Sequence, residues 1–450
     1  MIERYRLLSL FDGIGCFPLA YANKVGINHK DLKYESSEIE NYLLDILSTN
    51  FPKHNQLGNI EEINWNSLYL DKEKANIVTM GTPCTGFSTS GKRDGLENIE
   101  SRLFVNSVES IKIIKPKYFI WENVFGVLSN NKGMDFREVL KAFKEAGYNL
   151  AWTTYNTKYF GIPQKRRRVY MIGVRNDLKQ SKILEYIDPF NMINRAFSDD
   201  IFAYENMVDK FYEKNSFDLK DNKLSYFNRL RSDLFKAEGI AGTQAKRDYK
   251  SFRDVFVTND IIRRETPRER LRFQGMPDYW FDEQYSSYGR STLYKADGMS
   301  LPVVESVFDS LDKIDAFEFI RRVESNELYE EREKWVKTLS SDRKSSYQIL
   351  GCPSNMMGSN GKKEGKVQYS GIMMTDGKET ELFLTDRCSE AGHILKEGDI
   401  KSIADVYEGV VDDWYSVTDR SVDGILRRER DSNKKLPEEL REAIKRIYKK

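Results

Sequence analysis

The sequence is poor in the side chains that build disulfide frameworks and metal centres. It has four cysteines and three histidines, and neither type forms a close-spaced pair. This spacing argues against a disulfide framework, a zinc site and a histidine-based catalytic triad, and it suits a reducing compartment. We therefore expect no metal centre.

The chain also lacks an excess of one charge and any long apolar run. It carries 71 Lys and Arg against 70 Asp and Glu, for a net charge of +1, so any basic surface must be local. No apolar run approaches the length of a transmembrane helix, and residues 1–6 lack the apolar core of a signal peptide. These absences predict a soluble, cytoplasmic protein without a membrane partner.

A chain of 450 residues is long enough for two or three domains. Its first part alternates helical patterns with short apolar runs at residues 6–11, 32–36, 77–80, 118–121, 151–156 and 169–172. Strands that alternate with helices predict a doubly wound α/β domain. Such domains place their chemistry at the carboxyl ends of the strands.

Cys84 is placed at such an end. The run at residues 77–80 is broken by Gly81 and Pro83, so Cys84 is expected on the loop that follows a buried strand. A thiol becomes a nucleophile when its pKa is lowered and it is partly exposed. A lone cysteine is more often a small buried hydrophobic residue. The loop alone leaves both interpretations open.

A glycine turn, Asp12-Gly-Ile-Gly15, follows the first apolar run and opens a helical segment. Backbone N–H groups in such a turn can approach a ligand closely, although glycine turns also serve packing alone. Glu38 follows the second run, where a carboxylate holds ribose hydroxyls in nucleotide-binding folds. Its alternative role is to interact with the N-terminus of the next helix.

Two later runs are flanked by polar side chains. Glu122 follows the run at residues 118–121, and a basic sequence at residues 164–168 precedes the run at 169–172. The cysteine, the carboxylate and the arginines meet in space if the domain is doubly wound. Taken singly, the carboxylate has the alternative role of a structural ion-pair partner, and the basic sequence that of a solvated turn.

With these motifs in this order, the chain resembles the DNA (cytosine-5) methyltransferases of prokaryotes and phages over about residues 1–310. The matching segments are Phe11-Asp-Gly-Ile-Gly15, Pro83-Cys-Thr-Gly-Phe-Ser88, Glu122-Asn-Val124, Gln164-Lys-Arg-Arg-Arg168, Arg264-Glu-Thr-Pro-Arg-Glu269 and Gln274-Gly-Met-Pro-Asp278. The resemblance implies a Rossmann-like methyltransferase domain with a smaller target-recognition domain. It also implies methylation of a cytosine flipped out of a specific sequence of double-stranded DNA, as in restriction-modification systems.

The resemblance assigns catalytic roles to four residues. Cys84 would add to cytosine C6, Glu122 would hold N3 and the exocyclic amine, Arg166 would hold O2, and Arg168 would help to order the site. S-adenosylmethionine would donate the methyl group. The candidate cofactor-binding residues are Phe11, Asp12, Gly13, Gly15, Glu38, Asn59, Pro83 and Ser300. Three residues depart from the family pattern, namely Asn59, Thr85 and Met299.

No family motif occurs between residues 178 and 262, where such enzymes carry the target-recognition domain. Residues 220–253 are locally basic and suit contacts with DNA phosphates. The candidate DNA-binding residues are Ser88, Gln164, Arg229, Arg231, Thr243, Lys246, Arg247 and Arg253. For any one of these charges the alternative is an ordinary solvated surface.

We therefore predict a catalytic domain at residues 1–177, a target-recognition domain at 178–262, a return to the catalytic domain at 263–312 and a C-terminal extension at 313–450. The extension reads as a small α+β module with a hairpin around residues 375–378 and a basic helix after residue 437. Its role stays open between enlarging the DNA surface, self-association and binding a protein partner.

Two other functions also stay open. Some relatives methylate tRNA, although the large insert favours duplex DNA. The second is a DNA-binding regulator that has lost catalysis. The presence of Cys84, Glu122, Arg166 and Arg168 argues against it, whereas Met299 favours it because it departs from the family pattern. As a DNA-modifying enzyme, the protein is expected in the cytoplasm with the nucleoid.

Overall fold

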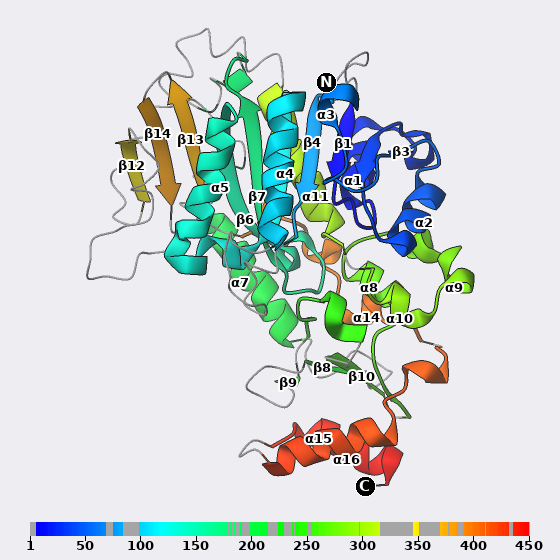
Figure 1. Cartoon of the computed structure of the whole chain (residues 1–450). Helices are drawn as coiled ribbons and strands as arrows, with labels where there is room; N and C mark the ends of the chain where they lie inside the picture. The colour runs from blue at the N-terminus through cyan, green and yellow to red at the C-terminus, as the bar shows by residue number, and fades with distance from the viewer. Residues whose placement is uncertain are drawn as a thin grey trace. The chain divides into compact units, whose positions relative to one another are not determined.

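The computed structural model divides the chain into two compact units (Figure 1). It describes residues 6–68, 75–83, 99–178, 180–181, 184, 190, 199–214, 224–228, 236–237, 239–249, 254–258, 260–296, 298–315, 345–350, 370–376, 379–385, 390–409, 411–431 and 435–449. The first unit contains Met1–Tyr155, Arg167–Ile201 and Val303–Gly392, and the second contains Asn156–Arg166, Phe202–Pro302 and His393–Lys450. The predicted extension is therefore shared between the two units.

A ten-stranded sheet forms the centre of the first unit, in the order β12-β14-β13-β6-β7-β5-β4-β1-β2-β3. Its strands are β1 Leu7–Leu10, β2 Glu35–Ser37, β3 Asn55–Gln56, β4 Ile77–Gly81, β5 Tyr118–Val124, β6 Tyr148–Asn156, β7 Arg167–Arg175, β12 Ser345–Leu350, β13 Ser370–Asp376 and β14 Glu379–Thr385. From β5 to β3 all neighbours are parallel, whereas β7 is antiparallel to β5. The predicted α/β class is confirmed.

Helices cover both faces of this sheet. They are α1 Cys16–Val25, α2 Asn41–Asn50, α4 Ile99–Ile114, α5 Met134–Glu145 and α11 Leu301–Asp315. Buried side chains of α4 and α5 pack with Val78, Met80 and Phe119 of the sheet. Because side chains alternate along a strand, Tyr118 points to the other face, where its hydroxyl donates to Asp315 of α11 over 2.7 Å. In Figure 1, α4 and α5 lie in front of the sheet and α11 lies behind it.

The strands of the extension continue the sheet of the first unit. β13 and β14 are antiparallel and end in the pair Asp376 and Glu379, which confirms the predicted hairpin. β13 also pairs with β6 through residues 371–373. This differs from a separate α+β module. The sequence pattern identifies the hairpin, but it does not show that β6 offers an open edge to pair with.

The second unit contains a four-stranded antiparallel sheet in the order β11-β10-β8-β9. The strands are β8 Ser225–Asn228, β9 Lys236–Ala237, β10 Asp254–Val257 and β11 Ile262–Arg263. On one face, Phe227, Val255 and Val257 pack against the amphipathic helices α15 Asp419–Asp431 and α16 Glu438–Tyr448. On the other, Tyr226 and Phe256 pack with Phe273 and with α14 Ile403–Val406. The end of the chain thus covers both faces of this sheet.

The remaining described elements are the long helix α7 and several short helices. They are the helices α3 Trp65–Leu68, α7 Asp199–Lys214, α8 Pro267–Arg272, α9 Gln284–Ser287 and α10 Arg290–Leu293, and the 3-10 helices His29–Asp31, Phe125–Leu128, Asn130–Gly133, Thr157–Phe160, Lys246–Tyr249, Asp278–Phe281, Glu397–Asp399 and Asp413–Tyr415. Among the described helices, none has both the length and the apolar character needed to cross a membrane.

Candidate active site

The carboxyl ends of β4 and β5 lie side by side. Gly81, the last residue of β4, pairs with Glu122 of β5. The next residue, Thr82, accepts hydrogen bonds at its hydroxyl from Trp121 Nε1 over 3.0 Å and from Asn123 Nδ2 over 3.1 Å. These bonds fix the residue that follows β4 and precedes Pro83. Pro83 is half-buried. Cys84 lies outside the described residues.

Glu122 forms an ion pair with one of the predicted arginines. In the antiparallel register of β5 and β7, Glu122 lies opposite Tyr170, and Arg168 is two residues from Tyr170 on the same face. Arg168 Nε is 3.0 Å from Glu122 Oε1, and the two side chains are only 14% and 11% exposed. Glu122 therefore has the ion-pair partner that its alternative role predicted, and this partner, Arg168, is itself one of the predicted catalytic residues.

Arg166 belongs to the second unit, where its segment is held by the insert. Lys165 N donates to Ala241 O over 2.8 Å, and Ala241 N donates to Pro163 O over 2.8 Å. Thr243 Oγ1 donates to Lys165 O over 2.6 Å. The Arg166 side chain is buried. The insert therefore supports the backbone that presents this arginine.

Gln164 is fully buried, and neither end of its amide meets a hydrogen-bonding partner among the described residues. An unsatisfied buried amide costs about 1–3 kcal/mol, so its retention calls for a reason. The prediction that Gln164 contacts DNA stays a prediction.

The other predicted DNA-binding residues are only partly described. Thr243 is half-buried, and Lys246 is exposed at the start of a 3-10 helix that also contains the backbone of Arg247. Ser88, Arg229, Arg231 and Arg253 lie outside the described residues.

The glycine turn after β1 has the left-handed backbone that glycine favours. The φ angles are 57° at Phe11, 59° at Gly13 and 80° at Gly15. A Cβ added at Gly15 would lie 2.6 Å from the Phe51 ring, whereas one added at Gly13 would meet nothing within 4 Å. Gly15 therefore serves packing, and the space at Gly13 fits the approach of a ligand.

Asp12 points into the protein. Ser9 Oγ donates to its carboxylate over 2.6 Å, and Tyr34 OH donates over 2.7 Å. Burial outweighs these bonds and raises the pKa of Asp12 to about 7. Tyr34 lies 22 residues from Asp12, so no local pattern identifies it as a partner, whereas Ser9 lies three residues before Asp12 in β1.

Glu38 bridges the glycine turn and the start of α2. Its Oε2 accepts from Gly13 N over 2.9 Å, and its Oε1 accepts from Ile39 N and Glu40 N over 2.8 and 3.1 Å. The carboxylate thus orients the glycine turn and the two residues that lead into α2. Its predicted roles, at the ribose and at the helix N-terminus, both stay predictions.

The residues that depart from the family pattern differ in setting. Asn59 Oδ1 accepts from Glu61 N over 3.1 Å and stabilises a turn after β3. In the second unit, Met299 is buried, and Gln274 holds both of its flanks by accepting from Gly298 N over 2.7 Å and Leu301 N over 2.8 Å. Ser300 is buried, and its hydroxyl has no partner among the described residues.

Five parallel strands, with a glycine turn after the first and a carboxylate after the second, place the protein among the α/β folds that have their ligand sites at strand ends. In the described part of the chain, no group of His, Cys, Asp and Glu is arranged to hold a metal ion.

Comparison with known proteins is more specific. The model of the family described as C-5 cytosine-specific DNA methylase matches residues 5–313, and the chain belongs to this family. It is 29% identical over 310 residues to the Type II methyltransferase M.NgoBI of Neisseria gonorrhoeae, covering 67% of this chain and 91% of that protein. It is 27% identical over 316 residues to the Type II methyltransferase M.HaeII of Haemophilus aegyptius, covering 69% and 93%.

A phage protein matches over a shorter stretch. The chain is 34% identical over 180 residues to the orphan methyltransferase M.SPRI of Bacillus phage SPR, covering 39% of each protein.

Proposed function

We propose that the protein transfers a methyl group from S-adenosylmethionine to C5 of a cytosine in a specific sequence of duplex DNA. The observation that carries the proposal is the ion pair of Glu122 and Arg168 at 3.0 Å, on the strand beside the one that leads to Cys84. Membership of the C-5 cytosine-specific DNA methylase family supports the same reaction. A duplex DNA substrate would place the protein with the nucleoid in the cytoplasm.

The cytosine ring must first be activated, because C5 is a weak nucleophile. The Cys84 thiolate would form a bond to C6, and the electron pair of the C5–C6 double bond would become available at C5. Glu122 would hydrogen-bond N3 and the exocyclic amine, and Arg168 would keep the Glu122 carboxylate oriented. After methylation a base removes the C5 proton, the double bond reforms, and the sulfur–C6 bond breaks to release Cys84.

The residues of the first unit fit the cofactor. A carboxylate has about four lone-pair positions, and Glu38 uses three for the N–H groups of Gly13, Ile39 and Glu40. One position remains for a ribose hydroxyl. The open space at Gly13 accommodates the close approach of a ligand to the backbone. When bound, S-adenosylmethionine supplies an electrophilic methyl group.

The target base would have to leave the duplex to reach Cys84, because C5 and C6 are stacked inside the helix. Arg166 would hold O2 of the flipped base. The segment of Arg166 is hydrogen-bonded to residues 241–243 of the insert, which supports a link between DNA recognition and base binding.

Mass spectrometry of nucleosides tests the proposal. The protein is incubated with S-adenosylmethionine and either mixed-sequence duplex DNA or bulk tRNA. We expect 5-methyldeoxycytidine from DNA alone. A product confined to tRNA would favour the tRNA enzyme, and specific DNA binding without turnover would favour the regulator.

Cys84→Ala provides the test of the covalent step, with Cys352→Ala as a matched cysteine control. We expect Cys84→Ala to abolish turnover and to leave the dissociation constant for S-adenosylmethionine unchanged. DNA with 5-fluorocytosine should trap the wild-type adduct, because fluorine cannot leave as a proton does. Loss of cofactor affinity in Cys84→Ala, without a trapped adduct in the wild type, would give Cys84 a structural role.

A further inference from the structure

The C-terminal extension contacts the segment that carries the predicted catalytic arginines, Arg166 and Arg168. In the first unit, Glu390 forms an ion pair with Arg167, which stands in sequence between Arg166 and Arg168. The guanidinium of Arg167 also lies 3.7 Å from the centroid of the Phe125 ring, in the 3-10 helix after β5. Arg167 is thus held by an aromatic face and by a carboxylate of the extension.

In the second unit, the extension packs against the start of the same segment. Lys401 N donates to Gly161 O over 2.9 Å, and the ring of His393 meets the Phe160 ring edge to face at 5.4 Å. A Cβ added at Gly161 would lie 2.8 Å from Asp399 O, and Gly161 has a φ of 77°. Residues 393–401 therefore fit closely against residues 160–161.

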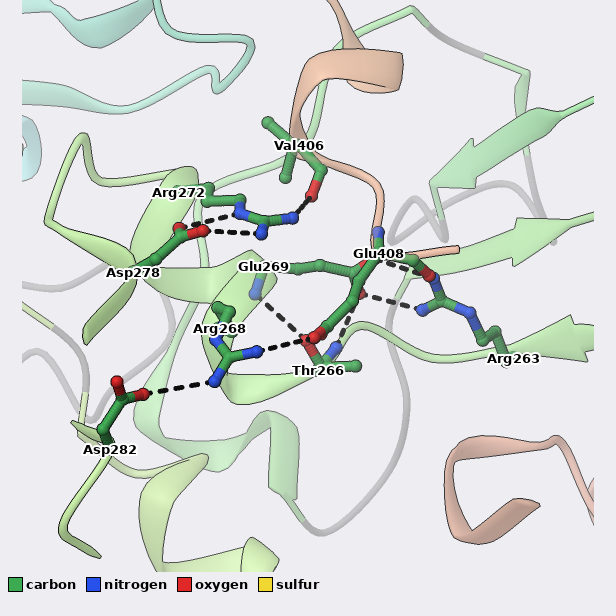
Figure 2. Close-up of polar contacts among 9 residues, drawn as sticks. All are labelled: Arg263, Thr266, Arg268, Glu269, Arg272, Asp278, Asp282, Val406 and Glu408. Atoms are coloured by element: carbon green, nitrogen blue, oxygen red, sulfur yellow. Dashed lines mark hydrogen bonds and ion pairs between the residues drawn. The ribbon is translucent and has the colours of Figure 1, made fainter. Parts of the chain in front are cut away.

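Glu408 attaches the extension to helix α8 with both its backbone and its side chain. Its N–H donates to Glu269 Oε1 over 2.7 Å, and its carbonyl accepts from Arg263 Nη2 over 2.8 Å. Its carboxylate accepts from Thr266 Oγ1 over 2.8 Å and from Arg268 Nη1 over 3.0 Å. Figure 2 shows Glu408 surrounded by these four partners.

These contacts reach the four-stranded sheet of the second unit, which we call the recognition sheet because β8, β9 and β10 lie within the predicted target-recognition domain. Arg263 lies in β11 and pairs with Phe256 of β10, and its side chain forms a fully buried ion pair with Glu269 of α8. A second attachment lies beside the first, since Arg272 Nη1 donates to Val406 O over 2.9 Å (Figure 2). The extension therefore contacts both β11, through Arg263, and α8.

We propose that residues 390–408 form a brace that positions the DNA-binding parts of the enzyme. Glu390 acts through Arg167 on the segment that carries Arg166 and Arg168, and Glu408 acts through α8 on the recognition sheet. Both are positioning residues. The brace lies beyond residue 313, where the match to the family ends. This inference rests on the proposed function and assigns the extension a part in it.

The test compares three variants of the full chain that each neutralise one glutamate. Glu390→Gln and Glu408→Gln remove a brace charge. Glu429→Gln is the matched control, because Glu429 also pairs with an arginine, Arg441, but within the two C-terminal helices. Turnover, the KM for duplex DNA, the dissociation constants for DNA and S-adenosylmethionine and the melting temperature are measured for each.

We expect Glu390→Gln to lower kcat roughly 10- to 100-fold, because small misplacements of base-binding groups have effects of this size. Glu408→Gln should raise the KM and the dissociation constant for DNA roughly tenfold. The neutral amide lacks the negative charge that strengthens the two hydrogen bonds from Thr266 and Arg268. Cofactor affinity should stay at the wild-type value in both, and Glu429→Gln should match the wild type in kcat and KM.

A charge exchange separates the ion pair from general packing. Arg167→Glu alone should impair turnover, and Arg167→Glu with Glu390→Arg should recover part of it. The brace is refuted if Glu390→Gln and Glu408→Gln behave like Glu429→Gln, if the exchange recovers nothing, or if cofactor affinity falls in parallel with turnover. A wild-type protein that methylates no DNA would instead refute the proposed function, and the DNA dissociation constant of Glu408→Gln would still test the brace.

Discussion

Burial of Asp12 should make the stability of the protein depend on pH in a predictable direction. The pKa of this carboxyl is raised from 3.8 to about 7, because burial destabilises the charged form more than the hydrogen bonds from Ser9 and Tyr34 stabilise it. The folded state therefore binds the Asp12 proton more tightly than the unfolded state does. Stability from this group is present at acid pH and is lost as the pH rises from about 4 to about 7.

The magnitude follows from the size of the shift. One pKa unit corresponds to about 1.36 kcal/mol, so the full penalty above pH 7 is about 4 kcal/mol. At pH 5, which is about one pH unit above the ordinary pKa of 3.8, the carboxyl is ionised in the unfolded chain and still protonated in the folded protein. The penalty at this pH is about 1.7 kcal/mol. Between pH 5 and pH 8, Asp12 should therefore reduce the free energy of unfolding by about 3 kcal/mol.

Asp12→Asn removes the titration and keeps the shape of the side chain. Urea denaturation, followed by circular dichroism at several pH values from 5 to 8, gives the free energy of unfolding of the wild type and the variant. The difference between them should change by about 3 kcal/mol in favour of the variant as the pH rises, whereas Asp45→Asn, at an exposed position of α2, should follow the wild type. Parallel curves for the wild type and Asp12→Asn would refute the reasoning.

Two further substitutions test packing and the buried ion pair. Glu269→Ala leaves the fully buried guanidinium of Arg263 without its carboxylate and removes the capping box of α8, so urea denaturation should show a loss of roughly 3–5 kcal/mol. An unchanged urea midpoint would contradict this expectation. Gly173→Ala places a Cβ 1.9 Å from the Phe119 ring on the neighbouring strand, and calorimetry should show a lower melting temperature that Phe119→Leu partly restores. A melting temperature equal to that of the wild type would contradict the predicted clash.

Much of the fold could be predicted because its strands are short apolar runs that end in glycine, proline or charge. β4 begins at Ile77 as expected and ends one residue late, at Gly81, and the hairpin of β13 and β14 follows its turn signal. Glu122 and Arg168 were predicted as site residues from their motifs, and the structure places their side chains together. Their ion pair required the antiparallel register of β5 and β7, which no local pattern contains.

The parts that were not predicted depend on contacts between distant segments. Thr82 bonds the residues on either side of Glu122, and Tyr34 bonds Asp12 from 22 residues away, but each is an ordinary polar side chain in its own stretch of sequence. The extension was expected as a module of its own, and its residues instead complete both units. Glu408 is one of many charged residues in a charged tail, and only its partners in α8 distinguish it.

The pairing of β13 with β6 has a consequence for shortened forms of the protein. β6, with the sequence Tyr-Asn-Leu-Ala-Trp-Thr-Thr-Tyr-Asn, is buried along its whole length and contains no charged residue. If the chain were cut after residue 313, this strand would become the edge of the sheet and expose unpaired backbone groups. Such an edge recruits strands from other molecules. The hairpin covers Leu150, Ala151 and Trp152 of this edge, and we expect fragments that contain only the family domain to aggregate more readily than the full chain.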